Sequence, residues 1–189
     1  MGGGTFQMLD LLPVGFRFKP TDQELVDHYL KHKLQGDDSD SLVAKIPVLN
    51  LCKVEPWDIP AFSVIKSNEP EWYFFSPLQS NRANRHGFWK YVGSDRNIKT
   101  TRTNIVIGTR KTLVFCRGGG ETDWVIHEYH AAATFDHAQR TFVLCHLMEG
   151  PTKKAALIRE EREFRRLESL DMASDHESED VESEGITVD

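Results

Sequence analysis

Several short segments rich in aromatic and β-branched residues follow one another between positions 71 and 147, and they constrain the fold more than any other feature. Turn-forming residues separate them, at Ser94–Asp95, Gly118–Gly120 and Asp136–Gln139. Short strands joined by tight turns pair with their neighbours in the chain, and such pairs are antiparallel. The sequence therefore predicts an antiparallel sheet with strands at 72–76, 87–92, 105–108, 112–117, 123–130 and 141–147.

Two stretches outside this region have helical character. Thr21-Asp-Gln-Glu24 has the form of a capping box, in which the Thr21 hydroxyl accepts from the Glu24 N–H and the Glu24 carboxylate reaches back. An apolar stripe at helical spacing follows and ends at Gly36. Residues 152–170 are highly charged with few apolar positions, which indicates an exposed helix.

Composition divides the chain into regions. Residues 1–10 are predicted to be a flexible N-terminus, 11–150 the main domain, 151–170 a charged helical extension and 171–189 an acidic disordered tail. The tail serves either as an activation or interaction segment or only as a solubilising terminus. The chain has no apolar run near the roughly 18 residues of a membrane span, and its start lacks a signal-peptide pattern.

Positive charge is concentrated between Gln79 and Arg117, although the whole chain carries a net charge of −6. Nine Lys and Arg residues lie there against one acid, Asp95. The nine are Arg82, Arg85, Lys90, Arg96, Lys99, Arg102, Arg110, Lys111 and Arg117. Aromatic and β-branched residues are interleaved with them, so these charges belong on folded strands. A basic segment inside an acidic protein points to a polyanionic partner.

The cysteine and histidine residues do not form a recognisable catalytic or metal-binding motif. Cys52, Cys116 and Cys145 are far apart, which favours small buried side chains in a reducing compartment over a disulfide framework. His127 and His130 stand three apart in a strand pattern and point to opposite faces, unlike the helical spacing of zinc proteases. We therefore expect no enzymatic activity, no metal site and no cofactor.

Five blocks of residues give the chain a specific resemblance to a known family. They are 12–26 (Leu-Pro-Val-Gly-Phe-Arg-Phe-Lys-Pro-Thr-Asp-Gln-Glu-Leu-Val), 55–58 (Glu-Pro-Trp-Asp), 71–77 (Glu-Trp-Tyr-Phe-Phe-Ser-Pro), 81–83 with 87–90, and 113–115 with 124–129. A final Phe142-Val-Leu-Cys145 also fits. In this order they resemble the NAC domain of plant transcription factors over residues 11–147.

The resemblance implies a fold, a partner and a location. The fold class is α+β, a twisted antiparallel β-sheet flanked by a few helices. Such domains dimerise, as homodimers or as heterodimers with other NAC proteins, and bind double-stranded DNA in the nucleus to regulate transcription. An edge strand bearing a Trp-Lys-Ala-Thr-Gly motif enters the major groove. Here that motif reads Trp89-Lys-Tyr-Val-Gly93, the loop after Pro77 is short, and the hairpin loop after Phe115 is trimmed.

Alternation along a strand assigns faces to the altered motif. Trp89 and Tyr91 share one face, expected to be the core, and Lys90 and Val92 share the face expected to meet DNA. Lys90 would contact phosphate or a guanine edge, and Val92 a thymine methyl. Phosphate clamps are expected from the surrounding cations. The complete DNA-binding set is Arg82, Arg85, Lys90, Tyr91, Val92, Gly93, Arg96, Lys99, Arg110 and Lys111.

The N-terminal arm carries the residues that match the family's dimer interface. Arg17 and Glu24 match positions that pair across it, and Leu12, Pro13, Phe16 and Phe18 would supply its apolar part or pack within their own subunit. The Glu24 carboxylate has a competing role in its own capping box. The altered motif and the short tail also favour an alternative function, a NAC-like protein-interaction module that heterodimerises with family members and modulates them.

Overall fold

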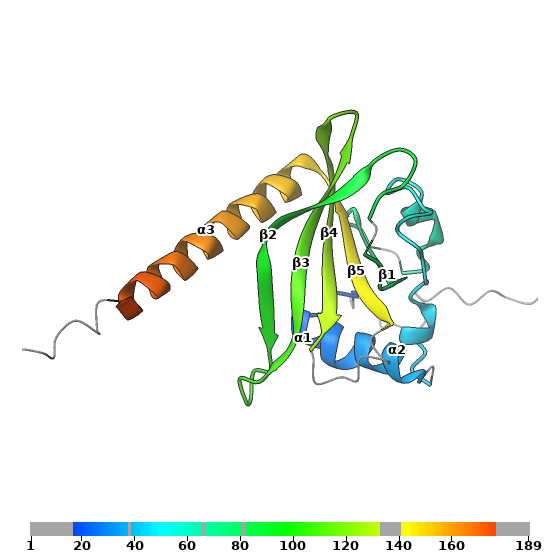
Figure 1. The fold of residues 1–189 in the computed structure, drawn as a ribbon. Coiled ribbons are helices and arrows are strands. Elements are labelled where there is room, and N and C mark those ends of the chain that lie inside the picture. Colours follow the sequence, from blue (N-terminus) through cyan, green and yellow to red (C-terminus); the bar gives the residue numbers. More distant parts are fainter. Residues whose placement is uncertain (1–16, 38, 66, 81, 133–140, 177–189) are drawn as a thin grey trace, which may run out of the picture.

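A computed structural model of the chain describes residues 17–37, 39–65, 67–80, 82–132 and 141–176. Its centre is a five-stranded sheet in which every neighbouring pair is antiparallel. The strand order is β1-β5-β4-β3-β2, and the sheet is visibly twisted in Figure 1. The strands are β1 (Glu71–Pro77), β2 (Phe88–Lys99), β3 (Val106–Arg117), β4 (Gly120–Ala131) and β5 (Phe142–Glu149). The predicted α+β class with an antiparallel sheet is confirmed.

The strands are longer than the sequence pattern predicted, and β2 and β3 differ most from it. The segments expected at 105–108 and 112–117 form one strand, β3, because the intervening positions pair with β2 and β4. The turn expected at Ser94–Asp95 is wrong. Those residues lie inside β2, where a bulge shifts the register between Val92 and Arg96. Gly93 adopts a φ of 97° there, a backbone conformation that other residues rarely adopt.

The predicted N-terminal helix is present and runs through three consecutive segments. They are α1 (Asp22–Glu24), the π-helical segment η2 (Leu25–Leu30) and α2 (Lys31–Gln35). The capping box is confirmed, since the Thr21 side chain accepts from the Glu24 N–H and the Glu24 carboxylate accepts from the Thr21 N–H. Gly36 ends the helix in the left-handed conformation that helix C-termini favour.

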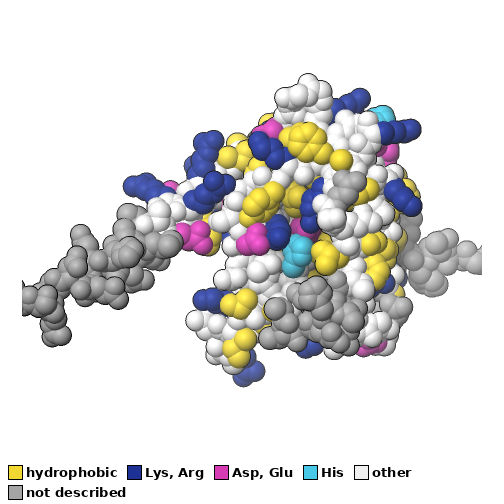
Figure 2. Space-filling model, viewed as in Figure 1, with side chains coloured by type: hydrophobic (Ala, Val, Ile, Leu, Met, Phe, Trp, Pro, Cys, Tyr) yellow, Lys and Arg dark blue, Asp and Glu magenta, His cyan; other side chains and the backbone are white. Residues whose placement is uncertain are grey.

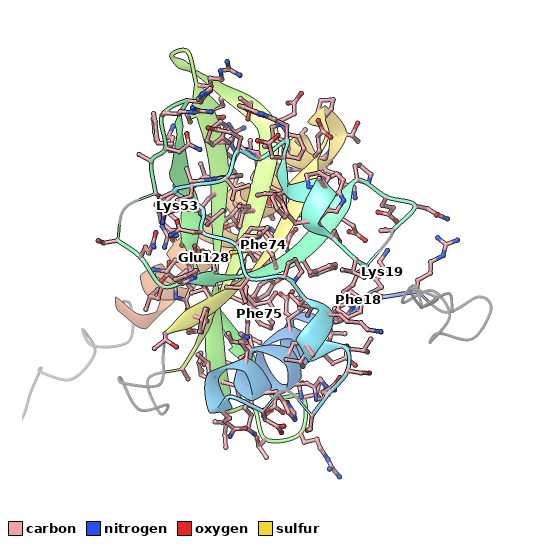
Figure 3. All side chains as sticks on the ribbon, turned by 90° about the vertical axis from the view of Figure 1, so that its right-hand side faces the viewer. Phe18, Lys19, Lys53, Phe74, Phe75 and Glu128 are labelled. Atoms are coloured by element: carbon pink, nitrogen blue, oxygen red, sulfur yellow. The ribbon has the colours of Figure 1, made fainter. Side chains whose placement is uncertain are left out.

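Each face of the sheet carries its own apolar cluster. Phe74 and Phe75, labelled in Figure 3, are consecutive on β1 and belong to different clusters, because neighbouring strand residues point to opposite faces. On the helix face, α1 to α2 packs its buried residues Leu25, Val26, Leu30 and Leu34 against the cluster of Phe75. On the loop face, residues 49–59 cover the cluster of Phe74, Trp89, Leu113 and Phe115. Two short 3-10 helices, η3 (Val43–Lys45) and η4 (Ile59–Phe62), lie in the segment between α2 and β1.

The C-terminal helix α3 (Pro151–His176) begins at the sheet and projects beyond β2 (Figure 1). It contacts β2, β4 and β5. The expected helical extension ended at Leu170, so the helix runs six residues into the segment expected to be disordered. The continuation contains the good helix formers Met172 and Ala173 and only extends a helix that is already nucleated. Residues 177–189 of the predicted acidic tail lie outside the described residues.

In the part of the chain that the structure describes, no helix has the length and apolarity that a membrane crossing requires.

Candidate nucleic-acid interface

Strand β2 is an edge strand, so one side of its backbone is not paired within the sheet. The loop before it folds back onto its start, where the Trp89 N–H donates to the Arg82 carbonyl. From Lys90 to Lys99, no other described segment pairs with the outer edge. An unpaired edge that carries cations is a surface on which a partner can dock.

Trp89 fixes the position of this edge. Its side chain is 4% exposed and lies against Phe115 with ring centroids 5.1 Å apart. Gly87, two residues earlier, lies so close to β3 that an added Cβ would be 2.2 Å from the Cys116 carbonyl oxygen. These contacts hold the beginning of the motif rigidly against the sheet.

The alternation of the motif is as expected, but the predicted burial of Tyr91 is wrong. Trp89 and Tyr91 pair with Phe115 and Leu113 on the loop face, while Lys90 and Val92 pair with Val114 and Thr112 on the helix face. Tyr91 is nevertheless 44% exposed. The loop-face cluster includes Trp89 but not Tyr91, which stands on the edge strand at the margin of that cluster.

The Tyr91 hydroxyl donates a 2.7 Å hydrogen bond to Asp95, the single acid of the basic segment. Partial burial and this bond to a carboxylate raise the pKa of Tyr91 above its usual range, so the side chain is a neutral phenol. Asp95 also lies 3.4 Å from the Lys111 ammonium. Lys90, on the other face, lies 3.2 Å from Glu121. Several of the predicted contact residues thus already have polar partners within the chain.

Arg82 does not occupy the solvent-facing position expected of a phosphate clamp. Its guanidinium makes a two-pronged bond to Glu128, with Nη2 donating to Oε1 at 2.7 Å and Nη1 donating to Oε2. The Glu128 side chain is completely buried, and the imidazole of His130 lies 2.5 Å from its Oε1. A buried carboxylate is unstable without such partners, so Arg82 stabilises the fold by compensating the charge of Glu128.

Arg96 and Arg110 are Cα partners on β2 and β3, and they lie beneath α3. Glu160 of α3 lies 2.6 Å from Arg96 and 3.3 Å from Arg110. Asp22, at the start of α1, accepts a further bond from Arg110 at 2.9 Å. The two arginine side chains are therefore enclosed between the sheet, α1 and α3 instead of being free in solvent.

The remaining cations are exposed. Arg85 lies in the loop before β2, Lys99 at its end and Arg102 in the turn that follows. Arg117 lies over the Trp57 ring at 5.0 Å. On the face shown in Figure 2, Lys and Arg side chains are spread among hydrophobic and acidic ones instead of forming one continuous patch.

The residues expected at a dimer interface lie at the edge of the described chain. Arg17 is exposed, whereas Leu12, Pro13 and Phe16 lie outside the described residues. The Glu24 carboxylate accepts from the Thr21 N–H at 2.7 Å and from its hydroxyl at 2.9 Å. These bonds lower the pKa of Glu24, so the capping box keeps its side chain charged.

His127 belongs to the buried helix face beside the two arginines. Burial lowers its pKa well below the usual value, and nearby Arg110, His146 and Arg96 lower it further, so the ring is neutral. Across the residues with described side chains, no group of three or more His, Cys, Asp or Glu could hold a metal ion.

Sequence reasoning missed three acids that decide the surroundings of these cations: Glu128, Glu160 and Glu161. Of these three, only Glu128 could have been recognised from the sequence pattern. It stands at an inward position of the apolar strand segment Trp124–Tyr129, where a charged side chain requires a buried partner. The α3 glutamates lie in a helix that is charged throughout, so nothing in the local pattern distinguishes them.

Comparison with known proteins gives a consistent set of similarities. A family model described as No apical meristem (NAM) protein matches residues 13–131. The chain is 36% identical over 185 residues to NAC domain-containing protein 71 of Arabidopsis thaliana, covering 88% of this chain and 68% of that protein. It is 40% identical over 162 residues to Protein CUP-SHAPED COTYLEDON 1 of the same plant, covering 76% and 51%. It is 41% identical over 154 residues to NAC domain-containing protein 54 of Oryza sativa subsp. japonica, covering 73% and 23%.

The share of each relative that is covered differs widely. The chain spans about two thirds of the first relative, half of the second and a quarter of the third. The similarity to the longer relatives therefore concerns one part of them.

Proposed function

Because this chain belongs to the NAC (No apical meristem) domain family of plants, we propose that it is a dimeric, sequence-specific double-stranded DNA-binding protein that acts in transcription in the nucleus. One observation carries the proposal: β2 is an edge strand anchored by Trp89, and from Lys90 to Lys99 no other described segment pairs with its outer edge, beside exposed cations. The major groove of B-DNA admits a two-stranded β-ribbon, so the edge formed by β2 and β3 can enter it.

In this proposal the strand enters the groove by its edge, so residues of both faces reach the bases. Lys90 and Val92 flank the edge on one side, and Tyr91, exposed with a neutral hydroxyl, flanks it on the other. Gly93 lies against the Glu161 carboxylate of α3, and its lack of a side chain gives the duplex room there only when that helix is displaced. Arg85, Lys99 and Lys111 neutralise phosphates around the groove. Arg96 and Arg110 ion-pair with Glu160 of α3, so they can join them only if that helix is displaced. Arg82 supports the site through its bond to Glu128.

The test is a titration of the full chain with duplex DNA over a series of salt concentrations. Neutralisation of about five or six phosphates predicts that log K falls against log[salt] with a slope near −5, at about −0.9 per phosphate. A slope near zero, or no binding at low salt, would remove the proposal. Selection of preferred sites from random duplexes then identifies the base sequence that the chain prefers. Repeating the selection with Tyr91→Ala and with Lys90→Ala tests whether either side chain contributes to that preference.

Dimerisation through the N-terminal arm is the second part of the proposal. Arg17 is exposed and free to form a bidentate bond with Glu24 of a second copy, although that carboxylate already serves its capping box. Arg17→Glu should then shift sedimentation toward monomer, and Arg17→Glu with Glu24→Arg should partly restore the dimer. An intact dimer in Arg17→Glu would count against this pairing.

A second candidate function is a protein-interaction module that pairs with other NAC proteins and modulates them. The observation in its favour is that Lys90, Arg96, Arg110 and Lys111 all have acidic partners within the chain. This candidate predicts that the chain alone fails to bind duplex DNA at low salt but forms a mixed dimer with another NAC domain in sedimentation experiments.

A further inference from the structure

Two arginines stand directly opposite each other in the sheet, which is an unfavourable arrangement unless an anion lies between them. Arg96 of β2 and Arg110 of β3 are Cα partners on the helix face, so their guanidinium groups share one small volume. Like charges at opposite positions of neighbouring strands repel. Their side chains are largely buried, which strengthens that repulsion. The sheet thus carries a preformed binding site for an anion.

Helix α3 supplies the anion. Glu160 lies within 3.3 Å of both guanidinium groups. The Glu161 Oε1 lies 3.2 Å from Arg96 Nε and accepts a 3.1 Å hydrogen bond from the Thr112 hydroxyl. The Phe164 ring covers the Arg96 guanidinium at 4.6 Å. Two carboxylates of one helix turn therefore occupy the position that a phosphate group would take between two arginines.

The carboxylates do not use all the hydrogen-bonding capacity of this site. Arg96 Nη2, Arg110 Nε and Glu161 Oε2 are buried, and within the described part of the chain none of them has a hydrogen-bond partner. A phosphate, with more acceptor oxygens arranged tetrahedrally, can meet donors that a carboxylate leaves unused. A groove of about 720 Å³ opens beside the arginines, between Thr21–Glu24, β2 and α3, and gives an external ligand access.

Helix α3 is also held in a way that permits its release. Up to Ser169, the end of its described side chains, only Glu161 is buried, and no apolar side chain of the helix is. Among the described residues, its other polar contacts are ion pairs from Lys153 to Glu69 and Glu71 and from Lys154 to Glu121, and a 3.4 Å hydrogen bond from the Ser94 hydroxyl to Glu168. Ion pairs of this kind contribute little free energy and weaken with salt.

We propose that α3 is an autoinhibitory element whose Glu160 and Glu161 act as internal mimics of phosphate, and that the DNA backbone displaces them from Arg96 and Arg110. This inference rests on the proposed DNA-binding function. The affinity for DNA is then reduced by the fraction of molecules in which α3 is docked, and any change that releases the helix raises it.

The experiment compares duplex binding of the full chain with that of Glu160→Gln/Glu161→Gln and of Phe164→Ala. The first variant removes the mimicking charges at nearly constant shape, and the second loosens α3 without changing any charge. Coupling between sites in proteins corresponds to about 5- to 150-fold, so we expect tighter binding in that range for the double variant and near its lower end for Phe164→Ala. Glu163→Gln and Leu167→Ala, exposed on the same helix, are the matched controls and should bind like the wild type.

Amide hydrogen exchange of residues 155–169 gives an independent readout of release. Exchange should accelerate when duplex DNA binds the wild type, and in Phe164→Ala it should be fast without DNA, because a helix without packing frays. Equal affinities in all variants with α3 still protected in the complex would overturn the inference and leave DNA binding intact. If Glu163→Gln tightened binding as much per removed charge as Glu160→Gln/Glu161→Gln, the effect would be one of net charge, and the inference would also be overturned. Failure of every variant to bind would overturn the proposed function itself.

Discussion

Replacing Arg82 by alanine distinguishes a structural arginine from a DNA-contacting one. The Arg82 guanidinium bonds both oxygens of Glu128, whose side chain has no solvent exposure. After the substitution Glu128 would retain His130 as a partner but lose its bidentate bond to the Arg82 guanidinium. The buried carboxylate would then lack its main compensating charge, and the folded state would lose stability.

The magnitude follows from the burial of the pair. Removing one partner of a buried ion pair costs about 3–5 kcal/mol, and the partial exposure of Arg82 places this case near the lower value, about 3 kcal/mol. For a chain of this length each kcal/mol shifts the melting temperature by about 2–4 °C, so a fall of about 6–12 °C is expected. Because the pair is buried, added salt should change this difference little.

The assay is denaturant unfolding of Arg82→Ala beside Arg85→Ala, an exposed arginine three residues away that should lose less than about 0.5 kcal/mol. Combining Arg82→Ala with Glu128→Gln completes a double-mutant cycle, in which a coupling energy of about 1–3 kcal/mol is expected for groups in direct contact. Equal stability of the two single arginine variants would refute the structural role. A salt slope of DNA binding reduced by about one unit in Arg82→Ala would instead indicate a phosphate contact.

Three further outcomes test the fold around the site. Trp89→Ala should lower the free energy of unfolding by about 3–5 kcal/mol, because it removes a buried aromatic side chain. Tyr91→Phe loses one exposed hydrogen bond and should lower it by at most about 1 kcal/mol. Losses of similar size in the two variants would contradict the edge position of Tyr91. Thr21→Ala removes the helix cap and should cost about 1 kcal/mol by the same measurement, and no loss would mean that the capping box contributes nothing. His127 is neutral in the folded state because its pKa is depressed. Below about pH 6.5 the unfolded chain therefore binds a proton that the folded chain does not. As the pH is lowered further, the free energy of unfolding decreases by up to about 1.4 kcal/mol per pH unit until the native pKa is reached. Urea unfolding at pH 7.5 and 5.5 measures this slope, which should be shallower in His127→Gln; an unchanged slope would assign it to other groups.

Local patterns in the sequence determined the elements that depend on neighbouring residues. The capping box at Thr21 and the helix end at Gly36 were predicted because their hydrogen bonds and backbone angles involve residues a few positions apart. The Gly118–Gly120 turn and the opposite faces of Trp89 and Lys90 follow from similarly short rules. The order of the five family blocks indicated the fold as a whole.

Only the tertiary structure decided what each charged side chain of the site does. Arg82 and Glu128 are separated by 46 positions, and Arg96 and Glu160 by 64, so no periodic pattern connects them. Burial of Tyr91 depended on whether another layer of the fold extended to the edge of the sheet, which alternation along one strand does not specify. The sequence shows that the segment from Gln79 to Arg117 is basic. Its division into a buried pair, a helix-covered pair and exposed cations arises from long-range packing, because the energy of a charge depends on which groups surround it after folding.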